Sequence, residues 1–177
     1  MATWCVGLGG QNIGAAVWQL KTLRGLAGDD KLVGGDGADV IYGGSGADII
    51  DGGAGNDIIN GGIGNDLISG GLGADLFTYS GRTNGINGGT DTITDFNFAA
   101  GDRIQLTGLA AQNIGSLTEE DFFANVLAVF DDGHGHAQIM TNSSDIIILE
   151  GVAVAEVTAA YFVDYARNQF QIIPIEG

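Results

Sequence analysis

One large apolar side chain recurs every nine residues between positions 25 and 78. This segment divides without insertions into six units, GLAGDDKLV, GGDGADVIY, GGSGADIID, GGAGNDIIN, GGIGNDLIS and GGLGADLFT. The fourth position is always Gly, the sixth is always Asp, and the eighth is Leu, Ile or Phe. The residues at the eighth position are Leu32, Ile41, Ile50, Ile59, Ile68 and Phe77. A flexible Gly/Asp-rich linker has no reason to keep this apolar position, so the period indicates a repeat architecture.

Each nonapeptide predicts a tight turn followed by a short strand. Glycines at positions one, two and four permit positive φ angles and close backbone approach, so the first six residues are expected to form the turn. The last three residues then form a strand, with position eight pointing inward and positions seven and nine pointing outward. Two units make one coil. The six units therefore predict an all-β fold, a parallel β-roll of three coils followed by a β-rich C-terminal flanking region.

The position-six aspartates are predicted to stack along the two edges of the roll. One edge holds Asp30, Asp48 and Asp66, and the other holds Asp39, Asp57 and Asp75. Neighbours on an edge lie about one strand spacing apart, ~4.8 Å. Two bare carboxylates at that separation repel by about 4 kcal/mol at an effective dielectric near 20. The stack therefore requires a cation.

Calcium fits this requirement best among the common metal ions. It takes about 6–8 oxygen ligands, which two Asp side chains and the turn carbonyls can supply, whereas magnesium needs stricter octahedra and retains its waters. Zinc prefers sulfur or imidazole ligands. Each edge has two gaps between neighbouring aspartates, so the repeats predict about four interior calcium ions. The predicted ligands are the six aspartates and the turn glycines Gly35, Gly37, Gly44, Gly46, Gly53, Gly55, Gly62 and Gly64.

Composition narrows the class of partner further. The chain has 22 acidic and six basic residues, a formal net charge of −16, and only Lys31 is basic within the repeats. Without a Lys/Arg cluster to neutralise phosphates, nucleic acid is not expected as a partner. Cys5 is the only cysteine, which excludes an intrachain disulfide and a thiol metal site. No apolar run reaches the roughly 18 residues that cross a membrane.

A second apolar row occupies position seven, which should face outward. Its members are Val40, Ile49, Ile58, Leu67 and Leu76. Exposed apolar rows are usually covered or used for binding, so the flanking segments, including residues 11–24, are expected to pack over this row. Leu23 falls in the inward register before Leu32, which predicts a degenerate first strand. Residues 1–24 are accordingly expected to be an N-terminal cap, residues 25–78 the roll, and residues 79–177 the C-terminal region.

Apolar and polar residues alternate again in the C-terminal region. The segment GTDTITDFNFAAGDRIQLTGL predicts strands divided by a turn at residues 100–102, and further strands are expected at 126–130, 137–140, 145–149 and within 161–175. SLTEEDFFANV predicts a short helix. DDGHGH predicts a polar hairpin turn rather than a metal site, because His134 and His136 would point to opposite faces of a strand.

The GGxGxDxUx unit resembles the RTX, or hemolysin-type, calcium-binding nonapeptide. With the following GxDxIxDFxxxxGDxIxL and acidic hairpin, residues 22–163 resemble the C-terminal domain of serralysin-type proteases and the R-modules of alginate epimerases. The resemblance implies a β-roll that folds on binding calcium outside the cell. It also implies a C-terminal signal read by a type I secretion system with its ABC exporter, and hence a secreted, extracellular protein. By the same resemblance, Asp91 or Asp95 completes a terminal calcium site.

No catalytic constellation is found in the sequence. HExxH, GxxxxGK[ST] and GxSxG are all missing, so the chain is interpreted as a non-enzymatic calcium-binding module of a type I secreted bacterial protein. The alternative is a carbohydrate-binding or auxiliary module of a larger secreted protease, lipase or epimerase, in contact with a polysaccharide or cell surface. An ice-binding solenoid would need a regular outward row of Thr or Asn. Only Asn56 and Asn65 occupy such positions, so this function is not favoured.

Overall fold

The computed structural model of the chain describes residues 3–6, 12–14, 21–80, 89–107, 127–141 and 146–163. In the first half these form nine strands, β1 (Thr3–Val6), β2 (Asn12–Gly14), β3 (Lys21–Ala27), β4 (Lys31–Asp36), β5 (Val40–Ser45), β6 (Ile49–Ala54), β7 (Ile58–Ile63), β8 (Leu67–Leu72) and β9 (Leu76–Ser80). The second half contributes β10 (Thr90–Ile93), β11 (Arg103–Thr107), β12 (Leu127–Asp131), β13 (Ala137–Thr141), β14 (Ile146–Leu149) and β15 (Phe162–Val163). Two short 3-10 helices, η2 (Val154–Glu156) and η3 (Ala159–Tyr161), precede β15.

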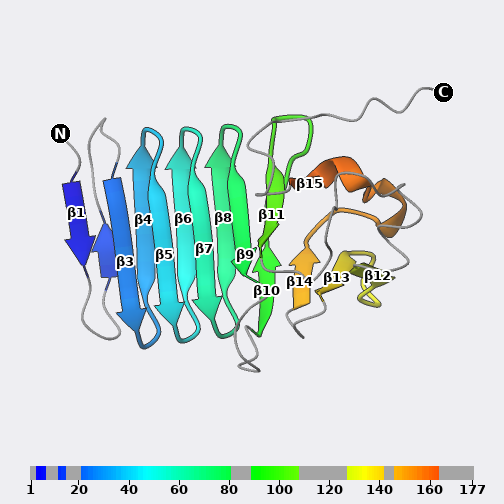
Figure 1. Ribbon diagram of the computed structural model, residues 1–177, viewed down its shortest axis with the longest axis horizontal. Helices are drawn as coiled ribbons and strands as arrows, with labels where there is room; N and C mark the ends of the chain where they lie inside the picture. Colours follow the sequence, from blue (N-terminus) through cyan, green and yellow to red (C-terminus); the bar gives the residue numbers. More distant parts are fainter. Residues whose placement is uncertain are drawn as a thin grey trace.

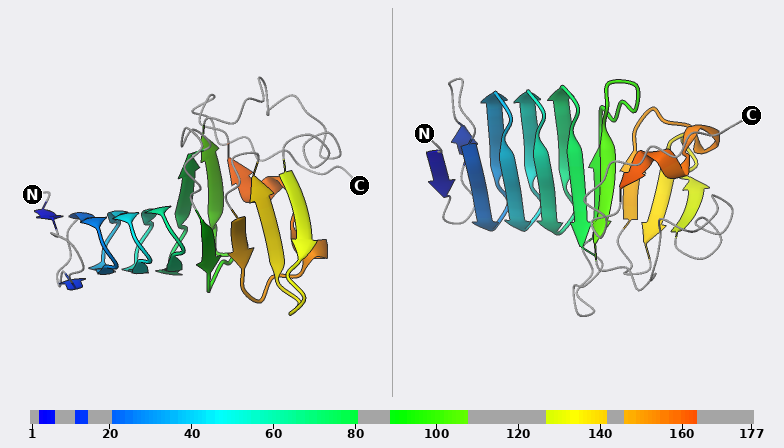
Figure 2. Two further views of the ribbon diagram at one scale, coloured as in Figure 1. Left: turned by 90° about the horizontal axis from the view of Figure 1, so that it is seen from below. Right: turned by 45° about the horizontal axis from the view of Figure 1, so that its top comes forward.

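The strands build two sheets that face each other, which confirms the all-β parallel roll (Figures 1 and 2). One sheet has the order β1-β3-β5-β7-β9-β11-β15 and the other β12-β13-β14-β10-β8-β6-β4-β2. Consecutive repeat strands therefore alternate between the sheets. Each strand pairs in parallel with the strand one coil later, as Val40 does with Ile58 and Gly44 with Gly62.

Each repeat strand is longer than the sequence pattern predicts. The strand begins at position seven and continues through positions one to three of the next unit, as in β5 and β6. The three-residue strand expected from the pattern is therefore too short, and the turn is confined to positions four to six. The glycines at positions one and two lie in the sheet because their missing side chains let successive coils approach closely. A Cβ on Gly53, for example, would overlap the carbonyl of Gly35.

The position-eight side chains form a single apolar column between the two sheets. All six are at most 1 % exposed, and Leu23 on β3 continues the column as predicted. Along each repeat strand, buried and accessible positions alternate, with position eight and the position-one glycine both buried. The core of the array is therefore one large side chain wide.

Three side chains of the position-seven row are exposed, contrary to the prediction that flanking segments cover this row. Ile49, Ile58 and Leu67 are 49, 40 and 45 % exposed. The N-terminal strands instead extend the sheets edge to edge, since β1 pairs with β3 and β2 pairs with β4. Edge pairing places these described strands beside the sheets and not over their outer faces.

The sheets also continue beyond the last nonapeptide. β10 pairs in parallel with β8, and β11 pairs in parallel with β9. β14 and β15 add one further strand to each sheet, and the antiparallel pair β12–β13 ends one of them. The sheets therefore run without a break through the expected boundaries at residues 24 and 78, and the three-part division stays a proposal about the sequence.

The C-terminal end of the roll has a broader core. The ring centroid of Phe96 lies 6.0 Å from that of Phe77 and 5.1 Å from that of Tyr161. Tyr161 also stacks on Phe98, with ring centroids 4.7 Å apart. Ile139, Ile147 and Leu149 are fully buried in the adjoining strands, so this end is closed by large side chains.

The DDGHGH segment is the predicted polar hairpin turn. Asp131 Oδ1 accepts hydrogen bonds from the backbone of Gly133 and Gly135, and Asp132 Oδ1 accepts from the backbone of His134 and His136. The helix expected at 116–126, the segment 81–88 and most of the 161–175 tail lie outside the described residues. No helix in the described segments has the length and apolarity needed to cross a membrane.

Candidate metal centre

Aspartates stack in a column on one edge of the roll, where each turn passes from one sheet to the other. Asp30, Asp48, Asp66 and Asp91 are 1–4 % exposed. The backbone N–H of Asp30 donates to Asp48 Oδ1 (2.8 Å), and that of Asp48 donates to Asp66 Oδ1 (2.8 Å). The N–H of Asp66 donates in turn to Asp91 Oδ1 (2.9 Å). We call these four residues the Asp30 column.

The opposite edge carries an equivalent column formed by Asp39, Asp57, Asp75 and Asp102. The backbone N–H of Asp39 donates to Asp57 Oδ1 (2.7 Å), that of Asp57 to Asp75 Oδ1 (2.9 Å), and that of Asp75 to Asp102 Oδ1 (3.0 Å). We call these four residues the Asp39 column. The two edges therefore hold the position-six aspartates in the two sets that the nonapeptide register predicts.

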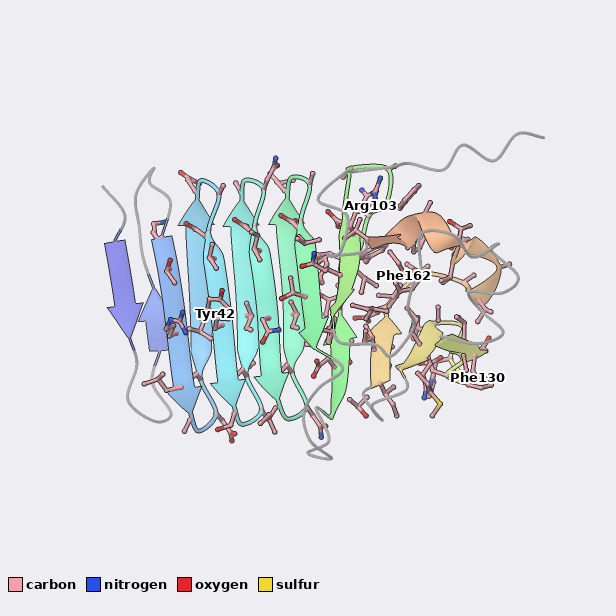
Figure 3. The ribbon with its side chains drawn as sticks, viewed as in Figure 1. Tyr42, Arg103, Phe130 and Phe162 are labelled. Carbon is pink, nitrogen blue, oxygen red and sulfur yellow. The ribbon has the colours of Figure 1, made fainter. Side chains whose placement is uncertain are left out.

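Asp102 extends the Asp39 column although sequence reasoning did not select it. The signal that could have found it is the order Asp, any residue, large apolar residue. Asp75-Leu76-Phe77 follows that order within the repeats, Asp102-Arg103-Ile104 follows it at β11, and Asp91-Thr92-Ile93 follows it at β10. Arg103, labelled in Figure 3, then packs its guanidinium 4.2 Å from the centre of the Phe98 ring. The order of Asp, any residue and large apolar residue therefore continues beyond the last glycine-rich nonapeptide.

The two oxygens of a column carboxylate have different surroundings. Oδ1 accepts the backbone hydrogen bond from the preceding coil, whereas Oδ2 of Asp48, Asp57, Asp66 and Asp75 is buried and has no hydrogen-bond donor. A buried carboxylate oxygen without a donor or cation is costly. Burial accordingly raises the pKa of the Asp48 carboxyl and raises the pKa of Asp57, Asp66 and Asp75 to about 6, with neighbouring aspartates adding to the rise.

These Oδ2 atoms face backbone carbonyls across the space left by position-one glycines. A Cβ on Gly43 would overlap both Gly61 O and Asp48 Oδ2, and a Cβ on Gly52 would overlap both Gly70 O and Asp57 Oδ2. Only glycine leaves this space open. The position-one carbonyls thus border the same space as the column carboxylates, and they are candidate ligands in addition to the predicted glycines at positions two and four.

One unit shows directly that its oxygens accept a positive charge. The ammonium Nζ of Lys21 lies 2.6 Å from Gly34 O, 3.4 Å from Asp36 O and 3.5 Å from Asp39 Oδ2. These are the carbonyls of positions one and three and the carboxylate of position six in a single nonapeptide. We call this set the oxygen cluster of a unit.

The donor chemistry of the oxygen clusters fits calcium. In the described part of the chain, no three His, Cys, Asp or Glu side chains converge on a common point, so carbonyls must complete any metal site. Calcium accepts such a mixture of carboxylates and carbonyls, whereas zinc selects imidazole and thiolate ligands. Two clusters from successive coils supply six oxygens, two of them from carboxylates, which reaches the lower end of calcium coordination at about 6–8 ligands.

Asp95 lies beside the end of the Asp39 column, close enough to Asp75 and Asp102 to raise the pKa of both carboxyls. Its own carboxylate accepts hydrogen bonds from Ser69 Oγ (2.6 Å) and from the backbone of Gly70 and Gly71 (both 2.9 Å). Asp91, by contrast, belongs to the Asp30 column. The resemblance offered Asp91 and Asp95 as alternatives for one terminal calcium site. The structure places them at the ends of different columns.

Comparison with known proteins identifies the repeats. The family model described as the RTX calcium-binding nonapeptide repeat matches residues 22–50 and 42–77. The chain is also similar to the solution structure of the AlgE6R3 subunit from the Azotobacter vinelandii mannuronan C5-epimerase, with 32 % identity over 84 % of this chain and 88 % of that one and a TM-score of 0.56. The chain belongs to the RTX repeat family. It is a calcium-binding RTX module, a fold that is not itself catalytic. No curated protein matches it.

Proposed function

We propose that calcium ions bind between successive coils of the RTX module along both columns. The interior positions are the gaps 30/48 and 48/66 on one edge and 39/57 and 57/75 on the other, which gives the four interior ions expected from the repeats. The gaps 66/91 and 75/102 are the proposed end positions, with Asp95 beside the second. The observation that carries this proposal is the set of buried Oδ2 atoms without donors at Asp48, Asp57, Asp66 and Asp75.

Calcium binding is proposed to drive the folding of the roll. Without the ion, the folded state must bury a row of carboxylates whose charges repel and whose second oxygens have lost water. The unfolded chain avoids that cost because its carboxylates stay hydrated. Since each proposed site combines the oxygen clusters of two stacked coils, the free energy of binding calcium becomes free energy of folding.

This coupling suits a protein that crosses a membrane unfolded and folds outside the cell. Extracellular calcium modules bind with dissociation constants of about 10⁻⁴–10⁻³ M, well above cytosolic calcium. We infer a secreted, extracellular module exported through a type I system with an ABC exporter. The support for export is the likeness of residues 22–163 to serralysin-type C-terminal domains.

Circular dichroism during a calcium titration tests the proposed function. The metal-free chain is expected to be largely disordered, and calcium is expected to produce β-structure cooperatively. Asp48→Ala and Asp57→Ala should each shift the midpoint to higher calcium. Asp51→Ala is the matched control, because Asp51 is an exposed repeat aspartate outside the columns. A spectrum that is the same with and without calcium would refute the proposal.

A second candidate is an auxiliary module of a larger secreted enzyme. The likeness to a mannuronan C5-epimerase subunit favours it. Affinity electrophoresis of the calcium-loaded chain in gels containing mannuronan tests this candidate, with neutral dextran as the control polymer. Equal mobility of the chain in the mannuronan and dextran gels would exclude a role in binding mannuronan.

A further inference from the structure

Lys21 occupies the place in the Asp39 column that an aspartate holds in every later coil. It lies 18 residues before Asp39, and its backbone N–H donates to Asp39 Oδ1 at 2.9 Å. The same bond links Asp39 to Asp57 and Asp57 to Asp75, each with the same 18-residue separation. The pairing of Thr22 with Val40 and of Leu23 with Ile41 fixes this register. The column therefore begins with a basic residue.

The side chain of Lys21 turns into the roll rather than toward water. Lys21 is 2 % exposed although lysine is almost never buried without a partner. Its ammonium reaches the whole oxygen cluster of the unit 34–42, namely Gly34 O, Asp36 O and Asp39 Oδ2. The side chain of Asp39 is fully buried beneath it. The ammonium donates to the carbonyls of Gly34 and Asp36, and its positive charge pairs with the Asp39 carboxylate.

Among the described residues, the next clusters along the array have no such internal cation. No ion pair joins Asp48, Asp57, Asp66 or Asp75 to a basic side chain there, and the other lysine of the chain, Lys31, is exposed. The contrast shows that the chain itself supplies a cation to the first cluster of the Asp39 column, from the preceding coil. The proposed calcium positions begin only at the next gap.

We propose that the Lys21 ammonium takes the place of a calcium ion at the N-terminal end of the Asp39 column. This inference rests on the proposed calcium binding at the other gaps. The first gap of the column then binds no metal, so the first coil closes without an ion on that edge. Lys21 is a positioning residue that sets how many ions the module binds and where the ion column begins.

Ion counting on the full chain tests this assignment. Equilibrium dialysis and native mass spectrometry give the number of calcium ions per chain at saturation. Lys21→Asp restores the column aspartate and is expected to bind one ion more than the unaltered chain. Lys21→Ala removes the ammonium and leaves the oxygens of unit 34–42 accessible, so it is expected to bind one additional, weaker ion. Lys31→Ala is the matched control and should not change the count.

Hydrogen exchange at limiting calcium gives a second readout. In the Lys21→Asp variant, the amides of β3 should need more calcium for protection than in the unaltered chain, because an additional ion must bind before the first coil closes. The inference is overturned if neither Lys21 variant gains an ion while the unaltered chain binds several. If the unaltered chain binds no calcium at all, the proposed function falls as well.

Discussion

Asp48, Asp57, Asp66 and Asp75 each divide their two carboxylate oxygens between two tasks. Oδ1 accepts a backbone hydrogen bond and fixes the stacking of adjacent coils, as Asp57 Oδ1 does for the N–H of Asp39. Oδ2 has no donor and provides the negative charge that attracts a cation. An asparagine could perform the first task but not the second. The two contributions can therefore be separated by substitution at one position.

Asp57→Asn and Asp57→Ala should differ in the calcium concentration at half folding. Asp57→Asn removes the charged ligand and raises the midpoint, but its side-chain oxygen can still accept the hydrogen bond from Asp39. Asp57→Ala also leaves that buried N–H without an acceptor, which costs a further ~1–3 kcal/mol. Calcium titration followed by circular dichroism measures both midpoints. Equal midpoints for the two variants would contradict the division of tasks.

At the level of the strand, the position-two glycines allow the coils to stack at close range. Gly44 has a φ of 119°, and a Cβ there would overlap the Leu26 carbonyl of the preceding coil. Gly133 in the β12–β13 turn has a φ of 89° but open space around it. The two glycines therefore share the need for positive φ and differ in packing.

Gly44→Ala is expected to destabilise the calcium-loaded module more than Gly133→Ala. The left-handed conformation alone costs an alanine about 1–2 kcal/mol, which applies to both variants. Only Gly44→Ala adds a collision with the neighbouring coil, so its loss should exceed that range. Urea unfolding at saturating calcium measures the free energies of unfolding. A loss at Gly44 no larger than that at Gly133 would show that the coils can separate at little cost.

The sequence predicted which strand positions are buried but not how long the strands are. Alternation correctly placed Leu32 and its equivalents in the core, because a large apolar residue at a fixed strand position has only one face on which to be buried. The strand lengths were underestimated because glycine is depleted from ordinary strands, whereas here Gly44 pairs with Gly62 in register. Lys21 lies in the same 18-residue register as the aspartates, but its burial was not predicted because lysine is almost never buried without a partner.

At the scale of the whole molecule, acid should have opposite effects on the metal-free and the calcium-loaded protein. Burial raises the pKa of Asp57, Asp66 and Asp75 from 3.8 to about 6 in the metal-free fold. Between these two values the metal-free fold binds more protons than the unfolded chain. Its free energy of unfolding therefore rises as the pH falls through about 6.

Protein stripped of metal on a chelating resin is accordingly expected to gain β-structure when the pH is lowered from 7 to 5. Calcium-loaded protein should instead lose stability over the same range, because protons compete with the ion for the carboxylates. Circular dichroism of both samples across the pH series measures the two trends. Metal-free protein that shows no gain on acidification would contradict the carboxylate repulsion on which calcium-dependent folding is based.

The constant 18-residue spacing between paired strands has a kinetic consequence. Parallel sheets usually fold slowly because their partners lie far apart in the sequence. In this array every new coil pairs with the one before it, so the entropy of closing a coil stays the same however many coils precede it. Ordered structure can therefore grow from one coil to the next, and the time needed should increase only in proportion to the number of repeats.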